Sequence, residues 1–413
     1  MVPNGWDIKS IEDIADVKGG KRLPKGYLLQ PENNGHPYIR VTDMYDGGVC
    51  TSSIQYVPKD AVSAISRYKI STKDIFITVA GTLGIVGIIP RELDGANLTE
   101  NADKLTNLKV EQGFLLEMLR SPLVQNHIEA EKTTNAQPKL ALTRIKGFQI
   151  PVPPLPEQRK IAQILSTWDR GIATTEKLID ASKQQKKALM QQLLTGKKRL
   201  VDPETGKAFE GEWEEVRLGD CSQVTSSKRV LKSDYVVTGV PFYRSKEIIL
   251  KSKNIKLKEI LYISDEQFNS LSKKHGRPEK GDILITAVGS LGVPYLVKEK
   301  ETFYFKDGNL LWLRKINELE GSFLIHYMKS EIFQNKIDSI TGGSSQKALT
   351  IIKLATLTAP RPRMDEQQKI ASVLTAADKD IELLEAKLAH FKQEKKALMQ
   401  QLLTGKRRVS LSS

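Results

Sequence analysis

The sequence predicts an α+β fold of two pseudo-symmetric repeats. Each repeat is a mixed α/β globular domain followed by a long α-helix, and the two helices pair as an antiparallel coiled coil. One observation behind this prediction is a duplicated dodecamer, KKALMQQLLTGK, at residues 186–197 and 395–406. Another is that weaker matches extend the duplication along nearly the whole 413-residue chain. Finally, each repeat ends in a helical pattern roughly 55 to 60 Å long, which exceeds the usual length of a globular helix.

The duplication can be followed motif by motif, at an offset that drifts between 204 and 209 residues. Small insertions and deletions therefore separate the motifs, as expected where surface loops connect a shared scaffold. The clearest matches are Trp6 with Trp213, Lys21-Arg22 with Lys228-Arg229, GHPYIR (35–40) with GVPFYR (239–244), KDIFITVAGTLG (73–84) with GDILITAVGSLG (281–292), and FLLEMLRSPLVQNHI (114–128) with FLIHYMKSEIFQNKI (323–337).

Each repeat changes in character part-way along its length. Short β-branched and aromatic runs, interrupted by Gly, Pro, Asn and Asp, predict a compact domain of strands with some helix. A polar stretch with helical periodicity then follows. The predicted boundaries are a first domain at 1–152, a first long helix at 153–198, a linker at 199–211, a second domain at 212–361, a second long helix at 362–406 and a tail at 407–413.

Both ends of the long helices carry local signals. Prolines in PPLPEQRKIAQIL (153–165) prevent the first helix from extending upstream, and Glu157 places negative charge in its first turn. Gly196 and Gly405 can adopt the left-handed conformation that ends a helix, and basic residues follow each of them.

A heptad pattern gives each long helix an apolar stripe, which a lone helix cannot bury. We therefore expect the two helices to pack against each other within one chain; the alternative is that each packs only on its own domain. Gly171, Thr175 and Ser182 weaken the pattern in the first helix. The predicted seam consists of Ile161, Leu165, Trp168, Ile172, Ile179, Leu189 and Leu193 in the first helix, and of Ile370, Leu374, Ile381, Leu384, Leu388, Phe391, Leu398 and Leu402 in the second.

Composition restricts the functional classes. The chain has 63 Lys+Arg against 49 Asp+Glu, a formal charge of +14, which suits nucleic acid or an anionic membrane surface; solubility alone is the alternative. Cys50 and Cys221 lie far apart without CxxC spacing, so neither a disulfide framework nor a zinc site is predicted, and a reducing cytoplasm fits. The N-terminus lacks a signal-peptide pattern. The most apolar run, 75–90, is too short to span a membrane.

Sequence motifs for catalysis and metal binding are missing. No GxxxxGK[ST] phosphate loop occurs, and the five histidines form no HxxxH or HExxH pair. The segment GTLGIVG (81–87) lacks the glycine spacing of a dinucleotide loop and is predicted to be a tight turn between strands. Asp74 and Asp282 are predicted to shape turns, and a carboxylate site is the alternative. We therefore predict a chain with no catalytic residue and no metal site.

These features together resemble the DNA-specificity subunit of type I restriction-modification systems. The resemblance spans almost the whole chain and rests on the helix starts IPVPPLPEQRKIAQIL (150–165) and PRPRMDEQQKIASVL (360–374), and on the two dodecamers. The second helix start departs from the first, because it has Arg361, Arg363 and Met364 where the first has Val152, Pro154 and Leu155.

The resemblance implies that each globular domain is a target recognition domain that reads one half of a bipartite, asymmetric site in double-stranded DNA. It implies that the paired helices dock two modification (methyltransferase) subunits, and it leaves open whether restriction (translocase and endonuclease) subunits join them. No membrane partner is expected. This chain would then be a non-catalytic subunit without a cofactor, and S-adenosylmethionine, ATP and Mg²⁺ would be bound by its partners.

Polar residues at matched loop positions are the candidates for DNA contacts. Lysines and arginines would neutralise phosphates, and a few side chains would read base edges in the major groove. Each candidate has an alternative as a solvated surface residue or, for the hydroxyls, as a turn former. The candidates are Lys21, Arg22, Arg40, Thr82, Gln137 and Lys139 in the first domain, and Lys228, Arg229, Arg244, Ser290, Gln346 and Lys347 in the second.

Two other functional classes remain open from sequence. A stand-alone nucleic-acid-modifying enzyme would need a methyltransferase or nuclease motif, and neither an NPP[FY] tetrapeptide nor a convincing PD…ExK set is evident. A coiled-coil adaptor would explain the helices, but it would leave the net charge and the paired basic loops without a purpose.

Overall fold

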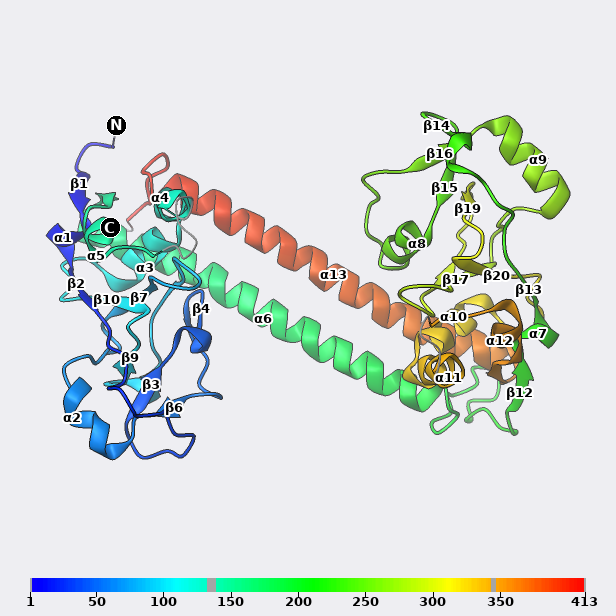
Figure 1. Cartoon of the computed structure of the whole chain (residues 1–413), viewed down its shortest axis with the longest axis horizontal. Helices are drawn as coiled ribbons and strands as arrows, with labels where there is room; N and C mark the ends of the chain where they lie inside the picture. Colours follow the sequence, from blue (N-terminus) through cyan, green and yellow to red (C-terminus); the bar gives the residue numbers. More distant parts are fainter. Residues whose placement is uncertain (1, 132–138, 343–346, 412–413) are drawn as a thin grey trace. The chain divides into compact units, whose positions relative to one another are not determined.

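The computed structural model describes residues 2–131, 139–342 and 347–411. The chain divides into two compact units, each of which contains one globular domain and parts of both long helices (Figure 1). Unit 1 consists of Met1–Lys177 and Ala386–Ser413, and unit 2 consists of Leu178–Glu385. Among the described residues, no helix is both long and apolar enough to cross a membrane.

The domain of unit 1 alternates short strands with short helices. Its strands are β1 Asp7–Ser10, β2 Asp16–Gly19, β3 Pro37–Ile39, β4 Met44–Tyr45, β5 Gly48–Val49, β6 Gln55–Tyr56, β7 Ile75–Thr78, β8 Val86–Gly87, β9 Asn97–Leu98, β10 Ala102–Thr106 and β11 Gln149–Val152. Its helices are α1 Ile11–Ile14, α2 Val62–Ile65, α3 Gln112–Arg120, α4 Pro122–Glu131 and α5 Leu142–Lys146, with 3-10 turns at Val41–Asp43, Lys59–Ala61 and Arg91–Leu93.

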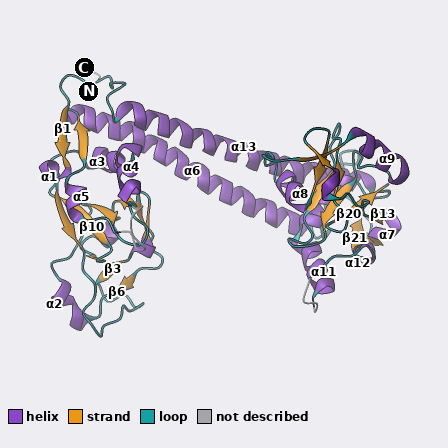
Figure 2. Ribbon diagram, turned by 45° about the horizontal axis from the view of Figure 1, so that its top comes forward, coloured by secondary structure: helices purple, strands orange, loops and turns teal. Residues whose placement is uncertain are grey.

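Four sheets organise this domain. The largest is antiparallel in the order β2-β10-β7-β8, and a smaller sheet has the order β6-β3-β9 with β3 and β9 parallel. Strand pairs β1-β11 and β4-β5 complete it. Figure 2 shows β3 and β6 with α2 at the end of the domain away from the chain termini.

The domain of unit 2 repeats this plan. Its strands are β12 Glu214–Arg217, β13 Gln223–Thr225, β14 Tyr235–Val236, β15 Val240–Tyr243, β16 Leu261–Ile263, β17 Ile283–Thr286, β18 Pro294–Leu296, β19 Tyr304–Phe305, β20 Leu310–Arg314 and β21 Thr358–Arg361. Its helices are α7 Leu218–Cys221, α8 Ser245–Ser252, α9 Asp265–His275, α10 Gly321–Lys329, α11 Glu331–Thr341 and α12 Ile351–Thr356, with a 3-10 turn at Lys232–Asp234.

The sheets show both the repeat and its divergence. The antiparallel sheet β13-β20-β17-β18 matches β2-β10-β7-β8, and the pair β12-β21 matches β1-β11. The smaller sheet differs, because it has four strands in the order β14-β16-β15-β19. The 11-residue helix α9 also lies in this part of the domain, where unit 1 has the four-residue α2. The repeats thus share one sheet closely and vary in the other.

The two long helices are α6 Leu155–Leu193 and α13 Met364–Leu402, each of 39 residues. Within unit 1 the start of α6 lies beside the end of α13, and within unit 2 the end of α6 lies beside the start of α13 (Figure 1). The helices are therefore antiparallel, and the predicted α+β fold of two repeats with paired helices is confirmed. The alternative, in which each helix packs only on its own domain, is wrong.

Candidate nucleic-acid interface

In unit 1 the described candidates surround one loop, residues 99–101. The amide of Lys21 donates to the carbonyl of Leu98, just before the loop (2.8 Å). The carbonyl of Ile39, the residue before Arg40, accepts the first amide of the loop (3.1 Å). On the other side, the amide of Ala80, two residues before Thr82, donates to the last carbonyl of the loop (3.3 Å). The same residue forms a β-bridge with Lys139. Segments that are far apart in sequence therefore meet at this loop.

Unit 2 builds the same arrangement around residues 305–309. Lys228 follows a serine whose hydroxyl donates to the first carbonyl of the loop (2.6 Å). Arg244 follows the residue whose carbonyl accepts an amide from the loop (2.9 Å). Shortly before Ser290, the amide of Ala287 donates to the last carbonyl of the loop (2.9 Å). The next residue, Val288, forms a β-bridge with the residue after Lys347.

These contacts define two equivalent surfaces. Loop face 1 consists of Lys21, Arg22, Arg40, Thr82 and Lys139 around residues 99–101, and loop face 2 consists of Lys228, Arg229, Arg244, Ser290 and Lys347 around residues 305–309. Gln137 and Gln346, which were also candidates, lie outside the described residues.

Most of the basic side chains on these faces are exposed, and one pair is equivalent in both units. The guanidinium Nε of Arg22 lies 2.8 Å from Glu100, and that of Arg229 lies 3.2 Å from Asp307. Each arginine is 77% exposed, so these ion pairs are weak and leave the guanidinium free to exchange its carboxylate for another anion.

Arg40 and Arg244 are held more firmly. Each guanidinium makes a two-point contact with a buried carboxylate three residues on: Nη2 of Arg40 lies 2.7 Å from Asp43, and Nη2 of Arg244 lies 2.7 Å from Glu247. Because unpaired buried carboxylates are costly, both arginines have a structural role beside the predicted one. Their contact with nucleic acid stays a prediction.

Thr82 and Ser290 lie in the tight turns that join β7 to β8 and β17 to β18. The backbone carbonyl of Thr82 accepts a hydrogen bond from the Thr78 hydroxyl (2.5 Å), and Ser290 accepts the equivalent bond. Gly84 has φ of +80°, which favours glycine, and its carbonyl accepts a bond from Gln125 (3.0 Å). The prediction of a tight turn at residues 81–87 is confirmed.

The carboxylates predicted to shape turns do so. Asp74 accepts a bond from the amide of Ser71 (2.9 Å), and Asp282 accepts the equivalent bond from Glu279 (2.9 Å). A further carboxylate lies at loop face 1: Asp103, in β10, is buried, and this burial raises its pKa to about 6 against the opposing charge of Lys139.

The Glu-Gln pair at the start of each long helix has a clear structural purpose. Glu157 accepts a hydrogen bond from the indole of Trp6 (3.3 Å). It also forms an ion pair with Arg408, which follows the second dodecamer. Glu366 accepts the same bonds from Trp213 (3.1 Å) and from Arg199 (2.6 Å), which follows the first dodecamer.

The glutamines attach the long helices to the domains. The side-chain oxygen of Gln158 accepts the amide of Glu111 at the start of α3 (2.8 Å), and its nitrogen donates to Pro153 (2.8 Å). Gln367 makes the matching bonds to Glu320 (2.7 Å) and Pro362 (2.8 Å). Both glutamines are buried, so their polar groups need these partners.

Each dodecamer packs into the domain of the other repeat. Leu193 and Leu194 of the first copy are buried in the hydrophobic core of unit 2. Leu402 and Leu403 of the second copy are buried in the core of unit 1. Two equivalent domains present two equivalent sites, which is a physical reason for one chain to carry the same twelve residues twice.

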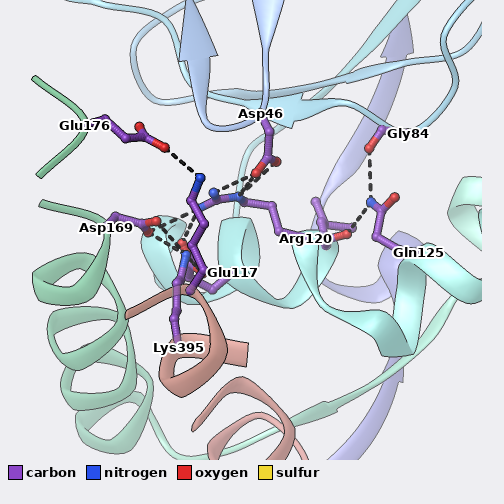
Figure 3. Close-up of polar contacts among 10 residues, drawn as sticks. Asp46, Gly84, Glu117, Arg120, Gln125, Asp169, Glu176 and Lys395 are labelled. Carbon is purple, nitrogen blue, oxygen red and sulfur yellow. Dashed lines mark hydrogen bonds and ion pairs between the residues drawn. The ribbon is translucent and has the colours of Figure 1, made fainter. Parts of the chain in front are cut away.

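The first lysine of each dodecamer joins the two helices. In unit 1, Lys395 Nζ lies 2.6 Å and 2.7 Å from the oxygens of Asp169 and 2.9 Å from Glu117 (Figure 3). Arg120 bridges Glu117 (2.7 Å), Asp169 (3.1 Å) and Asp46 (2.7 Å). Burial raises the pKa of Glu117, although Arg120 and Lys395 oppose this shift. In unit 2 the equivalent Lys186 forms an ion pair with Asp378.

A family model for the type I restriction modification DNA specificity domain matches residues 3–183 and, a second time, residues 210–393. Each match contains one globular domain and most of the long helix that follows it. The chain belongs to this family. It is therefore a DNA-specificity subunit of a type I restriction-modification system, as the resemblance implied.

Relatives of the specificity subunit match it from end to end. It is 28% identical over 427 residues to the MjaX specificity subunit of Methanocaldococcus jannaschii, covering 99% of this chain and 95% of the relative. The MjaVIII specificity subunit of the same organism is 24% identical, with 99% and 94% coverage. The crystal structure of a type I restriction-modification S subunit from M. genitalium has the same fold, with a TM-score of 0.59 at 19% identity and coverage of 100% and 99%.

The predicted seam residues of the specificity subunit divide into three groups. Trp168 packs edge-on against Phe391, with ring centroids 5.6 Å apart. Residues near the helix ends are buried in, or packed against, the domain cores: Ile161, Leu165, Leu398 and Leu402 in unit 1, and Leu189, Leu193, Ile370 and Leu374 in unit 2. Nearer the helix centres, Ile179 and Ile381 are buried, whereas Ile172, Leu384 and Leu388 are partly buried.

Sequence reasoning missed the polar residues that join the helices of the specificity subunit to its domains. Glu157, Gln158 and Lys395 are each less than 7% exposed and fully engaged. A signal was present, because each belongs to a segment repeated almost unchanged between otherwise divergent halves. Repetition of a polar residue at such a position indicates a shared partner inside the protein.

Proposed function

We propose that loop face 1 and loop face 2 each read one half of a bipartite, asymmetric sequence in double-stranded DNA. The observation that carries this proposal is the repetition of one arrangement, in which basic and hydroxyl residues surround a central loop in both units. The partly exposed side chains of the central loops differ, with Glu100 and Asn101 in the first loop and Lys306, Asp307 and Asn309 in the second. A shared frame suits equivalent phosphate contacts, and different loop side chains suit two different half-sites.

The partners follow from the family and from the repeat. We infer that two modification subunits bind, because the two units carry equivalent helix starts and equivalent dodecamers. Methyl transfer from S-adenosylmethionine then belongs to those subunits, and ATP- and Mg²⁺-dependent steps belong to any restriction subunit that joins. The specificity subunit contributes recognition and carries no catalytic step, and the complex acts in the cytoplasm.

A salt titration of duplex binding tests the role of the loop faces. Full-length chain with its modification subunits should bind duplex DNA with an affinity that falls steeply with salt. Lys21→Ala with Arg22→Ala should reduce the slope of log K against log [salt] by roughly one unit for each phosphate that the variant no longer neutralises. Arg67→Ala, an exposed arginine outside the loop faces, is the control. A slope equal to that of the control would remove both residues from the interface.

A further inference from the structure

The ionic cluster at the end of α3 in unit 1 has an incomplete counterpart in unit 2. Arg120, the last residue of α3, is surrounded by the carboxylates of Asp46, Glu117 and Asp169. The equivalent residue in unit 2 is Lys329, the last residue of α10. Its ammonium forms no ion pair or hydrogen bond with any described residue, and the nearby Asp378 is paired with Lys186 instead.

Two of the three carboxylates have been replaced in unit 2. Glu117 corresponds to His326. The unit 2 cleft is lined by Lys251 and Lys253 where the unit 1 cleft is lined by Asp46, and Lys251 is paired with Glu301 (2.8 Å). Only the equivalent of Asp169 remains, and this residue, Asp378, is already paired with Lys186. Lys329 in unit 2 therefore lacks two of the anions that surround Arg120 in unit 1.

A cleft lies at this place in unit 2. It has a volume of about 550 Å³ and is bounded by α8, β18, α10 and the unit 2 portions of α6 and α13. Six lysines and three carboxylates line it, whereas the equivalent cleft in unit 1 is lined by five basic and four acidic residues. The unit 2 cleft therefore has the larger positive surplus.

One ring nitrogen of a buried histidine on this cleft has no partner among the described residues. His326 is 3% exposed, and its Nε2 lies 3.0 Å from the hydroxyl of Thr375. Its Nδ1 is buried and has no hydrogen-bond partner among the described residues, the nearest Asp378 oxygen being 3.9 Å away. Unsatisfied buried polar groups are uncommon, and one on a basic cleft is consistent with a missing ligand.

We propose that this cleft binds a phosphate group, which takes the place that the Asp46 carboxylate occupies in unit 1. The ammonium groups of Lys329 and Lys298 would neutralise the phosphate, and His326 forms part of the wall of the cleft. Lysine ammonium groups are common phosphate ligands. Unlike Arg120, which its own chain satisfies, Lys329 is left to bind an external anion.

Duplex DNA is a source of such a group within reach of the cleft. Helix α8 starts directly after Arg244 of loop face 2 and ends at Ser252, which lines the cleft. Its eight residues span about 12 Å, which equals roughly three to four base pairs along a duplex. A strand whose backbone contacts Arg244 could thus place a later phosphate at Lys329. This part of the inference rests on the proposed function, whereas binding of free phosphate does not.

The test begins with inorganic phosphate and the full-length chain. Broadening of the phosphorus NMR signal should show binding to the wild-type protein. Lys329→Gln should weaken this binding about tenfold, because a charged hydrogen bond is removed. Lys329→Arg should retain it, and Lys273→Gln, an equal charge change on exposed α9, should behave as wild type. Circular dichroism spectra identical to wild type exclude misfolding as the cause.

A second arm identifies the source of the phosphate. If DNA fills the cleft, Lys329→Gln lowers the salt slope of duplex binding by about 0.9 relative to Lys273→Gln; if free phosphate fills it, the slopes are equal and only phosphate binding weakens. If Lys329→Gln and Lys273→Gln bind phosphate equally well, the proposed phosphate site is wrong. Duplex binding by the wild-type complex would still support the proposed function in that case. Failure of the wild-type complex to bind duplex would instead contradict the proposed function and leave the phosphate result standing.

Discussion

Replacement of Lys395 by methionine should loosen unit 1 and leave unit 2 unchanged. Lys395 is 6% exposed, and its ammonium lies 2.6 to 2.9 Å from oxygens of Asp169 and Glu117. Methionine preserves most of the apolar stem but removes the charge. The buried Glu117 and the partly exposed Asp169 would then share Arg120 as their remaining cation.

The expected cost is large because breaking a buried ion pair leaves an uncompensated charge. Such losses are about 3 to 5 kcal/mol at neutral pH, which corresponds to a change of roughly a hundredfold to several thousandfold in a local opening equilibrium. The matched substitution Lys186→Met in unit 2 should cost less, about 1 kcal/mol, because Lys186 pairs with one partly exposed carboxylate, Asp378, and has no counterpart of the buried Glu117.

The effect should depend on pH with a definite sign. Burial raises the pKa of Glu117, and the positive charges of Arg120 and Lys395 oppose that shift. Without Lys395 the pKa of Glu117 rises further, so the variant binds a proton more readily in its folded state. The destabilisation should therefore be greatest at pH 7 and should shrink as the pH falls towards 5.

Hydrogen–deuterium exchange with peptide resolution measures this outcome. Amides of α3 and of the end of α13 should exchange about a hundredfold or more faster in Lys395→Met at pH 7, while α10 and α11 stay protected. In Lys186→Met the smaller change should fall in unit 2. Unchanged exchange in α3, or an acceleration of equal size at pH 5 and pH 7, would refute the electrostatic reasoning.

Three further outcomes follow from the structure. A fragment ending at Thr205 should form a homodimer. Lys186 of one copy can take the place of Lys395 beside Asp169 of the other, and Arg199 can take the place of Arg408 beside Glu157. A monomer by sedimentation, even with modification subunits present, would contradict this prediction. Arg199→Ala should accelerate amide exchange at the start of α13, because Glu366 is fully buried, and unchanged protection would show that Trp213 alone suffices. Burial lowers the pKa of His326 to about 4, so unit 2 should lose stability as pH falls from about 6.5 to about 4, and His326→Leu should flatten that part of the profile in exchange measurements.

The sequence was sufficient for features that depend on neighbouring residues. Gly196 and Gly405 both adopt positive φ, +70° and +71°, where a helix end was predicted. The repeat itself supplied the architecture, because two copies of one plan need two equivalent places to pack. The antiparallel pairing of α6 and α13 follows from the same symmetry.

Features that depend on burial could not be predicted from the sequence. Arg40 and Arg244 read as exposed basic residues, yet each neutralises a carboxylate whose burial is decided by the packing of distant strands. Lys395 and Lys186 share the same twelve-residue context, but only the domain opposite determines that one is more buried and meets two carboxylates. Local sequence cannot distinguish such pairs, because the partner residues lie far away in the chain.

Mapping of modified bases shows whether the two loop faces read separate halves of one DNA site. The full set of subunits, expressed in a host that lacks other methyltransferases, should modify a bipartite, asymmetric motif with a spacer of fixed length. Exchange of Glu100 and Asn101 for other polar residues should alter only one half of that motif, and exchange of Lys306, Asp307 and Asn309 should alter only the other. A single uninterrupted motif, or changes in both halves from either exchange, would contradict the account.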